Sequence, residues 1–314
     1  MKDIKDHILA TISYFNIFSY PLTAWQCYHW LYLGNNKDLS IPDYQEFENI
    51  LKSMVVDQTL GGADGFYFLS GKEKNVRLRQ HRYMLAEFKF KKAIRAAKIL
   101  RCLPHIKYIA VCNTLAYNNA HEDSDIDLLI ITNNKHIWAA RLWSVLVMSI
   151  LGRRPTIKTT QDKICLSFFL NENSLDLHDI QIEHDVYLLY WLVQLVPIYD
   201  PLQMHKQLLQ ANDYWLKPHL PNYLVYQTNA VRVVKKQSLC LIIKFILSLL
   251  FIWPGSETVL KRIQFAILPT SLKNIVNKDK RVIMNDQMLK FHDQDKREQY
   301  RDKFMEQIQK YEAD

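Results

Sequence analysis

The feature that most constrains the fold is a stretch over residues 106–132 that contains two aspartates two positions apart. Apolar and β-branched residues over 106–112 predict a buried strand, and polar residues over 113–124 predict a loop. Asp125 and Asp127 then open a second apolar run over 128–131, which predicts another buried strand. Side chains at positions i and i+2 of a strand point to the same face. We therefore expect the two carboxylates to lie side by side where the second strand begins.

Two neighbouring carboxylates repel each other unless a positive charge neutralises them. A divalent cation does so, and Mg²⁺ prefers carboxylate oxygens, water and phosphate oxygens as ligands. The pattern therefore predicts a Mg²⁺ site at Asp125 and Asp127. A second interpretation is that Ser124 and both aspartates are solvated residues at the end of a strand, or caps.

The stretch resembles the signature of the DNA polymerase beta-like nucleotidyltransferase superfamily, in which a strand ends in a Gly-Ser turn and an Asp-apolar-Asp strand follows. Ser124-Asp125-Ile126-Asp127-Leu128 matches the S-D-I-D-L form of that second strand, whereas Asn113-Thr114 stands where the family has Gly-Ser. Glycine lets the backbone approach a triphosphate closely, and asparagine tolerates unusual dihedral angles better than most residues. The order of segments is also similar to that of an uncharacterised bacterial subgroup, in which a winged-helix-like segment precedes the transferase unit and a helical tail follows.

The resemblance implies transfer of a nucleoside monophosphate from a nucleoside triphosphate to a hydroxyl group. Asp125 and Asp127 would be catalytic and would hold one or two Mg²⁺ ions. The residues implied to bind the nucleotide are Asn113, Thr114, Ser124, Arg153 and Arg154. The sequence does not identify the acceptor, which could be a protein or a small molecule; nucleic acid is possible but not favoured.

Catalytic members of the superfamily place a third carboxylate on the neighbouring strand, where it completes the metal site or acts as general base. The strand expected over 164–170 contains no Asp or Glu, and Ser167 is expected at the inner position. Asp176, beyond that strand, is the best substitute for the third catalytic carboxylate, although it could equally be a loop or helix-entry residue. The alternative function is therefore a catalytically impaired protein of this fold that acts as a nucleotide sensor or scaffold.

Residues 1–71 predict a winged-helix-like domain with three helices and a hairpin whose strands lie at 55–56 and 66–69. Such a domain suggests a DNA-binding regulator as a further alternative. The third helix, however, carries Asp43, Glu46 and Glu48 against the single base Lys52, whereas DNA contact depends on Lys and Arg. A protein contact or a scaffolding role is the preferred interpretation.

Residues 72–104 predict a basic helical linker, which is either a solvated helix face or an electrostatic guide for a nucleotide or polyanion. Residues 203–314 predict a helical C-terminal region. The most apolar run of the chain, 238–253, is expected to be a buried helix; a membrane-surface helix and a membrane span are the alternatives. Residues 287–312 are expected to form a solvated terminal helix.

Composition limits the class of protein to which the chain can belong. Its 314 residues are 49% hydrophobic, contain only seven glycines and carry a net charge of +8. These values favour a helix-rich α/β (α+β) protein whose nucleotidyltransferase core, over 105–202, contains a small mixed sheet. The five scattered cysteines show no metal-ligand spacing and are expected to be small buried hydrophobic residues. They predict a reducing compartment and a cytoplasmic protein, with peripheral membrane contact through 238–253 as an option.

Overall fold

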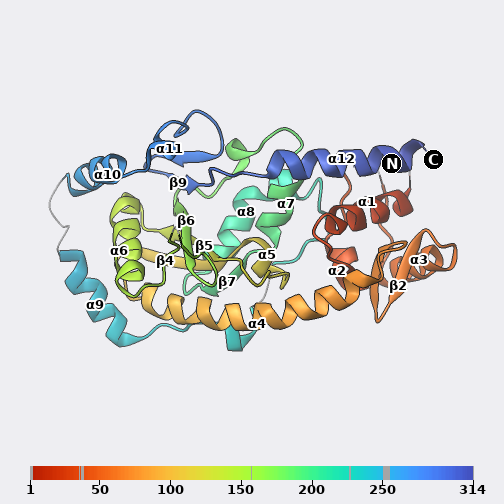
Figure 1. Ribbon diagram of the computed structural model, residues 1–314, viewed down its shortest axis with the longest axis horizontal. Coiled ribbons are helices and arrows are strands. Elements are labelled where there is room, and N and C mark those ends of the chain that lie inside the picture. The colour runs from red at the N-terminus through yellow and green to blue at the C-terminus, as the bar shows by residue number, and fades with distance from the viewer. Residues whose placement is uncertain are drawn as a thin grey trace.

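A computed structural model describes residues 3–34, 36, 39–156, 158–225, 228–249 and 255–313. The chain has an α+β fold rich in helices, with one three-stranded and one six-stranded sheet in the described part (Figure 1). Residues 250–253 of the apolar run 238–253 lie outside the described residues.

The six-stranded sheet is mixed and has the strand order β7-β4-β5-β6-β9-β8. Its strands are β4 (Ile106–Val111), β5 (Ile126–Thr132), β6 (Ile164–Asn171), β7 (Val196–Tyr199), β8 (Val282–Met284) and β9 (Met288–Phe291). Strands β5 and β6 are parallel, and every other neighbouring pair is antiparallel. The sequence correctly predicted that the strand over 164–170 pairs with the strand that carries the two aspartates.

Helices cover both faces of this sheet, which explains why β4, β5 and β6 have almost continuous apolar sequences. On one face, Leu129 and Ile131 pack with helices α7 (Val186–Val193) and α8 (Met204–Leu216). On the other face, Leu128 and Ile130 pack with helices α4 (Lys74–Leu100), α6 (Ile137–Ile150) and α10 (Ser256–Ala266). The sheet is therefore the centre of two hydrophobic cores.

The N-terminal unit consists of helices α1 (Ile4–Asn16), α2 (Ala24–His29) and α3 (Tyr44–Val56) and strands β1 (Leu22–Thr23), β2 (Leu60–Ala63) and β3 (Phe66–Leu69). The three strands form an antiparallel sheet in the order β1-β3-β2. The predicted strand at 55–56 is wrong, because α3 continues through Val56 and the first hairpin strand begins at Leu60. The unit shares its core with α7 and α8, so it packs directly on one face of the large sheet.

Helix α4 is one long helix that runs from the N-terminal unit along the large sheet (Figure 1). Just beyond its C-terminal end, Cys102 forms a disulfide with Cys240 of helix α9 (Ser238–Ser248). The expectation that all five cysteines are no more than small buried hydrophobic residues is therefore wrong for this pair. The two partners are 138 residues apart in the sequence, so their spacing could not reveal the pair. Cys27 and Cys112 are buried, as predicted.

The C-terminal region is not wholly helical. After α10 and the short helix α11 (Thr270–Lys273), strands β8 and β9 extend the large sheet beside β6. Helix α12 (Arg297–Ala313) then returns along α1 and α7 (Figure 1). Its Phe304 is fully buried in the core that includes residues of α1 and α7. The expectation of a solvated terminal helix over 287–312 is correct for α12, most of whose described residues are exposed or partly exposed. It is wrong for residues 288–291, which form the short buried strand β9.

The expectation that the apolar run 238–253 forms a buried helix is also wrong for its described part. Helix α9 spans Ser238–Ser248, and most of its large side chains are exposed. Among the helices of the described residues, none is both long enough and apolar enough to cross a lipid bilayer.

Candidate functional site

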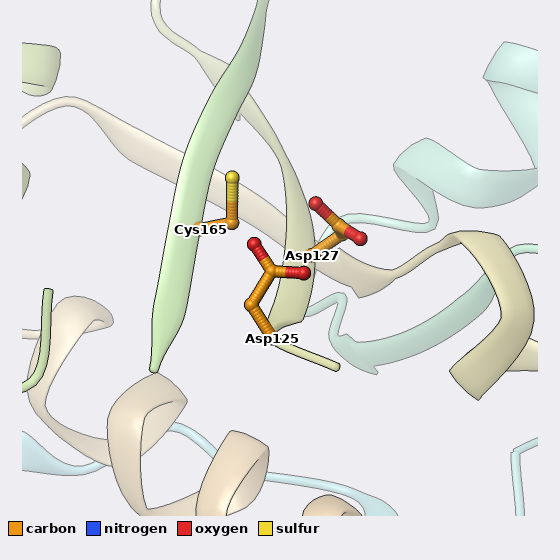
Figure 2. Close-up of side chains that lie close together, drawn as sticks. All are labelled: Asp125, Asp127 and Cys165. Carbon is orange, nitrogen blue, oxygen red and sulfur yellow. The ribbon is translucent and has the colours of Figure 1, made fainter. Parts of the chain in front are cut away.

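Asp125, Asp127 and Cys165 meet at the end of β5 and β6 where both strands begin (Figure 2). Asp125 immediately precedes β5, Asp127 is its second residue, and Cys165 is directly opposite Asp127 on the parallel strand β6. One potential ligand atom from each residue lies within 4.8 Å of the other two. The predicted neighbourhood of the two carboxylates is therefore present, with a thiol as its third member.

The thiol was missed because the sequence alone could not give the register between the two strands. Ser167 was expected at the inner position, but Cys165 is the residue in register with Asp127. The Ser167 hydroxyl instead lies 3.3 Å from Nε2 of His292, which follows β9. Cys165 could have been found from parallel pairing that matched the first apolar residues of the two runs.

Burial and mutual repulsion make the aspartate pair prone to protonation. Burial, together with the charge of Asp125, raises the pKa of Asp127 to about 7. Burial also raises the pKa of Asp125, although Lys89 and Arg154 oppose that shift. Burial, followed by the two aspartates, raises the pKa of the Cys165 thiol well above its ordinary value. The thiol is therefore neutral at physiological pH when no cation is bound.

Asn113 has a side chain that contacts the aspartate pair and a backbone conformation that glycine favours. It begins the short helix α5 (Asn113–Ala116) with a φ of 57°, in the left-handed region. Its amide Nδ2 donates to Asp127 Oδ2 at 2.7 Å. Trp191 Nε1 and the Tyr187 hydroxyl donate to its Oδ1 at 2.9 and 3.3 Å. These bonds fix the orientation of the amide and tie the turn to the site.

A cavity of about 170 Å³ opens beside Asn113. Aromatic and basic side chains line it together: Phe168, Tyr187, Trp191, Tyr300, Lys290, Lys296 and Arg297. The rings of Phe168 and Trp191 are stacked, with their centroids 5.4 Å apart. Asp295 also lines the cavity and is paired with Lys290 and Arg297, which leaves Lys296 as the basic lining residue without an acidic partner among the described contacts. Flat apolar surfaces next to a cation suit a ligand with a planar ring and a negative charge.

The structure brings some of the other predicted site residues to the aspartates. Burial lowers the pKa of Arg154, which interacts electrostatically with Asp125 and Cys165 and donates to the Ile164 carbonyl at 3.0 Å. Ser124 adjoins Asp125 in the chain, but its hydroxyl donates to the His121 carbonyl. Thr114 lies next to Asn113 in α5, where its carbonyl accepts from the Asn119 amide.

Two predicted residues make their observed contacts elsewhere. Arg153 accepts a bond from the Ile164 amide through its backbone carbonyl. Asp176 is exposed and accepts hydrogen bonds from the His178 amide and the Tyr214 hydroxyl of α8. Asp176 is not part of the cluster with Asp125 and Asp127 that the described residues form.

Lys89 of α4 supports the loop that leads into the site. Its side chain is only 3% exposed, and its ammonium group donates to the carbonyls of Glu122 and Ser124 at 3.0 and 2.6 Å. It also forms an ion pair with Asp162, just before β6, at 3.0 Å. The basic helix was predicted to be either a solvated face or an electrostatic guide for a nucleotide or polyanion. Lys89 of this helix instead holds together the two segments that carry Asp125 and Cys165.

We expect Lys89→Met to lower the free energy of unfolding by about 1 to 2 kcal/mol, because the partly buried Glu122 carbonyl loses its donor and the Ser124 carbonyl keeps only the Asp162 amide. The loss is limited because Lys92 still pairs with Asp162 at 2.6 Å. Urea unfolding of the variant measures the change. Lys91→Met, at an exposed neighbouring position on α4, is the control and should change stability by less than about 0.5 kcal/mol. Equal losses in the two variants would contradict the role of Lys89 in holding the two segments together.

Of the three side chains in the cluster, the two carboxylates are the ones that could hold a hard divalent cation. Two carboxylates supply oxygen atoms, which Mg²⁺ prefers, and the neutral thiol of Cys165 is a poor ligand for such an ion. Burial of the two carboxylates makes their ionisation unfavourable. The positive charge of a bound cation would reduce this cost.

Protein-family models, curated proteins and solved structures contain no match to this chain. Interpretation of its function therefore depends on the geometry of the site and on the motif that the sequence carries.

Proposed function

We propose that the chain is a Mg²⁺-dependent nucleotidyltransferase, which moves a nucleoside monophosphate from a nucleoside triphosphate to a hydroxyl group of a protein or small molecule. The observation that carries the proposal is the position of Asn113. Its amide donates to Asp127, and the same residue lines the aromatic and basic cavity. A cation at the aspartates and a nucleotide in the cavity would thus be neighbours.

The residues that would hold each part follow from these contacts. Asp125 and Asp127 would hold the cation, which supplies positive charge for the phosphates when bound. The rings of Phe168 and Trp191 offer a surface on which a nucleobase could stack. Lys296 offers positive charge, whereas Lys290 and Arg297 are already paired with Asp295, which also lines the cavity. The left-handed backbone at Asn113 supports the comparison with the glycine turn of the superfamily.

A second candidate function, nucleotide binding without transfer, is favoured by Cys165. It occupies the strand position opposite Asp127, where a third carboxylate would be expected. A thiol whose pKa is raised by burial keeps its own proton at neutral pH, so it cannot accept the proton of an attacking hydroxyl. Such a protein would be a nucleotide sensor or scaffold.

Calorimetric titration with each nucleoside triphosphate, in Mg²⁺ and in EDTA, tests the binding that both candidates share. We expect Asp125→Asn to weaken Mg²⁺-dependent binding by at least about tenfold, because one charged ligand of the cation is lost. Asp123→Asn is the matched control: it makes the same chemical change at an exposed aspartate of the same loop and should leave affinity unchanged. An affinity for the nucleotide that is the same in Mg²⁺ and in EDTA, or the same in Asp125→Asn and Asp123→Asn, would contradict the proposal.

Transfer is then measured with α-phosphate-labelled nucleotides and protein or small-molecule acceptors. Label on an acceptor in the wild type, lost in Asp125→Asn, supports the transferase. Binding without label supports the sensor. In that case Cys165→Asp, which places a carboxylate opposite Asp127, is the informative variant, since label transfer gained by it would identify the missing group.

A further inference from the structure

Helix α9 exposes its apolar side chains and points its single charge at the protein. The exposed large residues on this helix and directly after it are Leu239, Leu241, Ile242, Phe245, Ile246 and Leu249. At 3.6 residues per turn these positions share one broad face. On the opposite face Cys240 is buried, and Lys244 donates to the carbonyl of Ile106, the first residue of β4, at 2.9 Å.

This orientation is the reverse of that of a surface helix in water, which buries its apolar face and exposes its charges. Phe245 is 65% exposed and Ile242 is 57% exposed. The helix is held in this orientation by several contacts, namely the Cys102–Cys240 disulfide, the bond from Lys244, and bonds from the Arg101 guanidinium to Lys235 and Gln237. A contiguous apolar surface of this kind indicates a partner.

The charges around α9 identify the kind of partner. The chain has no Asp or Glu between Asp213 and Glu257, or between Glu87 and Glu122, and these two stretches meet at the Cys102–Cys240 disulfide. Lys235 and Lys236, both exposed, immediately precede the helix. Lys98, near the end of α4, is exposed as well. The apolar face therefore has basic neighbours at the N-terminal end of the helix.

A cavity of about 520 Å³ lies at the inner side of α9, between the helix and the start of β4. Its basic lining residues are Arg101, His105, Lys107, Lys236 and Lys244, and no Asp or Glu is among the described residues that line it. Lys107 is paired with Glu172, and burial lowers the pKa of His105 to about 4, so that His105 is neutral. Arg101 and Lys236 remain as cations at the N-terminal end of the helix, whereas Lys244 faces the protein and donates to Ile106.

We infer that α9 is a membrane-surface helix that binds bilayers of anionic phospholipid. Its apolar face would lie among the acyl chains, and the neighbouring lysines and arginine would contact the phosphates of the headgroups. An apolar face flanked by lysines matches a lipid surface, whereas a protein partner or a second copy of this net-basic chain would have to supply acidic groups. The chain would then bring its nucleotide site to a membrane.

Cosedimentation with lipid vesicles tests the inference on the full chain. We expect the wild type to bind vesicles of phosphatidylcholine with phosphatidylserine, and to bind pure phosphatidylcholine at least about tenfold more weakly. Ile242→Glu/Phe245→Glu should weaken binding to anionic vesicles by at least about tenfold, because charges replace the side chains that enter the acyl region. Lys235→Gln/Lys236→Gln should weaken it at low salt, about fivefold for each lysine that contacts the surface.

Ile150→Glu is the matched control, since Ile150 is 75% exposed on α6. It should bind vesicles like the wild type, and circular dichroism should show that all variants are folded. A wild type that does not sediment with anionic vesicles overturns the inference. If light scattering shows a dimer that Ile242→Glu/Phe245→Glu dissociates, while vesicles are not bound, the face belongs to a second copy of the chain and the inference is equally wrong.

Discussion

Asp127→Asn is expected to stabilise the metal-free protein by about 2 kcal/mol at pH 8. Burial and Asp125 raise the pKa of Asp127 from an ordinary 3.8 to about 7 on folding. A shift of that size corresponds to roughly 4 kcal/mol of unfavourable ionisation, of which we expect about half because the two aspartates share it. Asparagine has no charge to bury, and its Oδ1 can still accept the bond from Asn113.

The pH dependence of this gain follows from the direction of the pKa change. Above pH 7 Asp127 is ionised in both the folded and the unfolded chain, so the full penalty of burying the charge is present. As the pH falls towards 4, the folded protein is protonated at Asp127 and the penalty shrinks. The stability difference between Asp127→Asn and the wild type should therefore be largest at pH 8 and small at pH 4.

Thermal and urea unfolding in EDTA, at both pH values, measure this difference. Asp123→Asn serves as the reference, because Asp123 is exposed and should change stability by less than about 0.5 kcal/mol. Addition of Mg²⁺ should then stabilise the wild type and the reference more than Asp127→Asn, because only a folded site with both carboxylates binds the cation well. A lower stability of Asp127→Asn in EDTA at pH 8 would contradict the assignment of a strained carboxylate pair.

This carboxylate pair was predictable from sequence because its geometry is local. Asp125 and Asp127 are two residues apart, and the strand period alone places them on one face. The neighbouring strands were equally predictable, because their sequences are continuously apolar. Strands of this kind are buried on both faces, and the sheet indeed has a hydrophobic core on each side. Asn113 also belongs to this local region, and its positive φ agrees with the known tolerance of asparagine for that conformation.

The parts that sequence did not predict depend on register and on distant contacts. Cys165 joins the site through parallel pairing of β5 and β6, which are separated in the chain by α6. Strand β9 is only four residues long and includes Lys290, so its apolar pattern is too short to be recognised among the charged residues around it. The orientation of α9 is set by Lys244 and by the disulfide to Cys102, and both contacts connect segments more than a hundred residues apart. The helical period of the sequence predicts which residues share the apolar face of α9, but it does not predict whether that face is covered by the rest of the protein.

The largest loss of stability is expected for Arg297→Met, at about 3 to 5 kcal/mol. The Arg297 guanidinium donates to Asp185 at 2.6 Å, to the Ile180 carbonyl at 2.9 Å and to Asp295 at 2.9 Å. The side chains of Arg297 and Asp185 are 6% and 0% exposed. Removal of the arginine leaves the Asp185 charge buried without its ion-pair partner, which is far more costly than the loss of a surface pair. The same arginine joins α12 to the N-cap of α7, next to the cavity.

A double-mutant cycle separates the buried charge from the loss of packing. Asp185→Asn removes the charge but can still accept the bond from the Leu188 amide that caps α7. In urea unfolding, we therefore expect the loss of stability in Asp185→Asn/Arg297→Met to be smaller than the sum of the losses in the two single variants. The difference, which is the coupling energy, should be about 1 to 3 kcal/mol. Arg301→Met, which breaks an exposed pair with Asp302 on the same helix, should cost less than about 1 kcal/mol. Arg297 also lines the cavity beside Asn113. A stability loss for Arg297→Met no greater than that for Arg301→Met would contradict the role of the buried Arg297–Asp185 pair in holding α12 against α7.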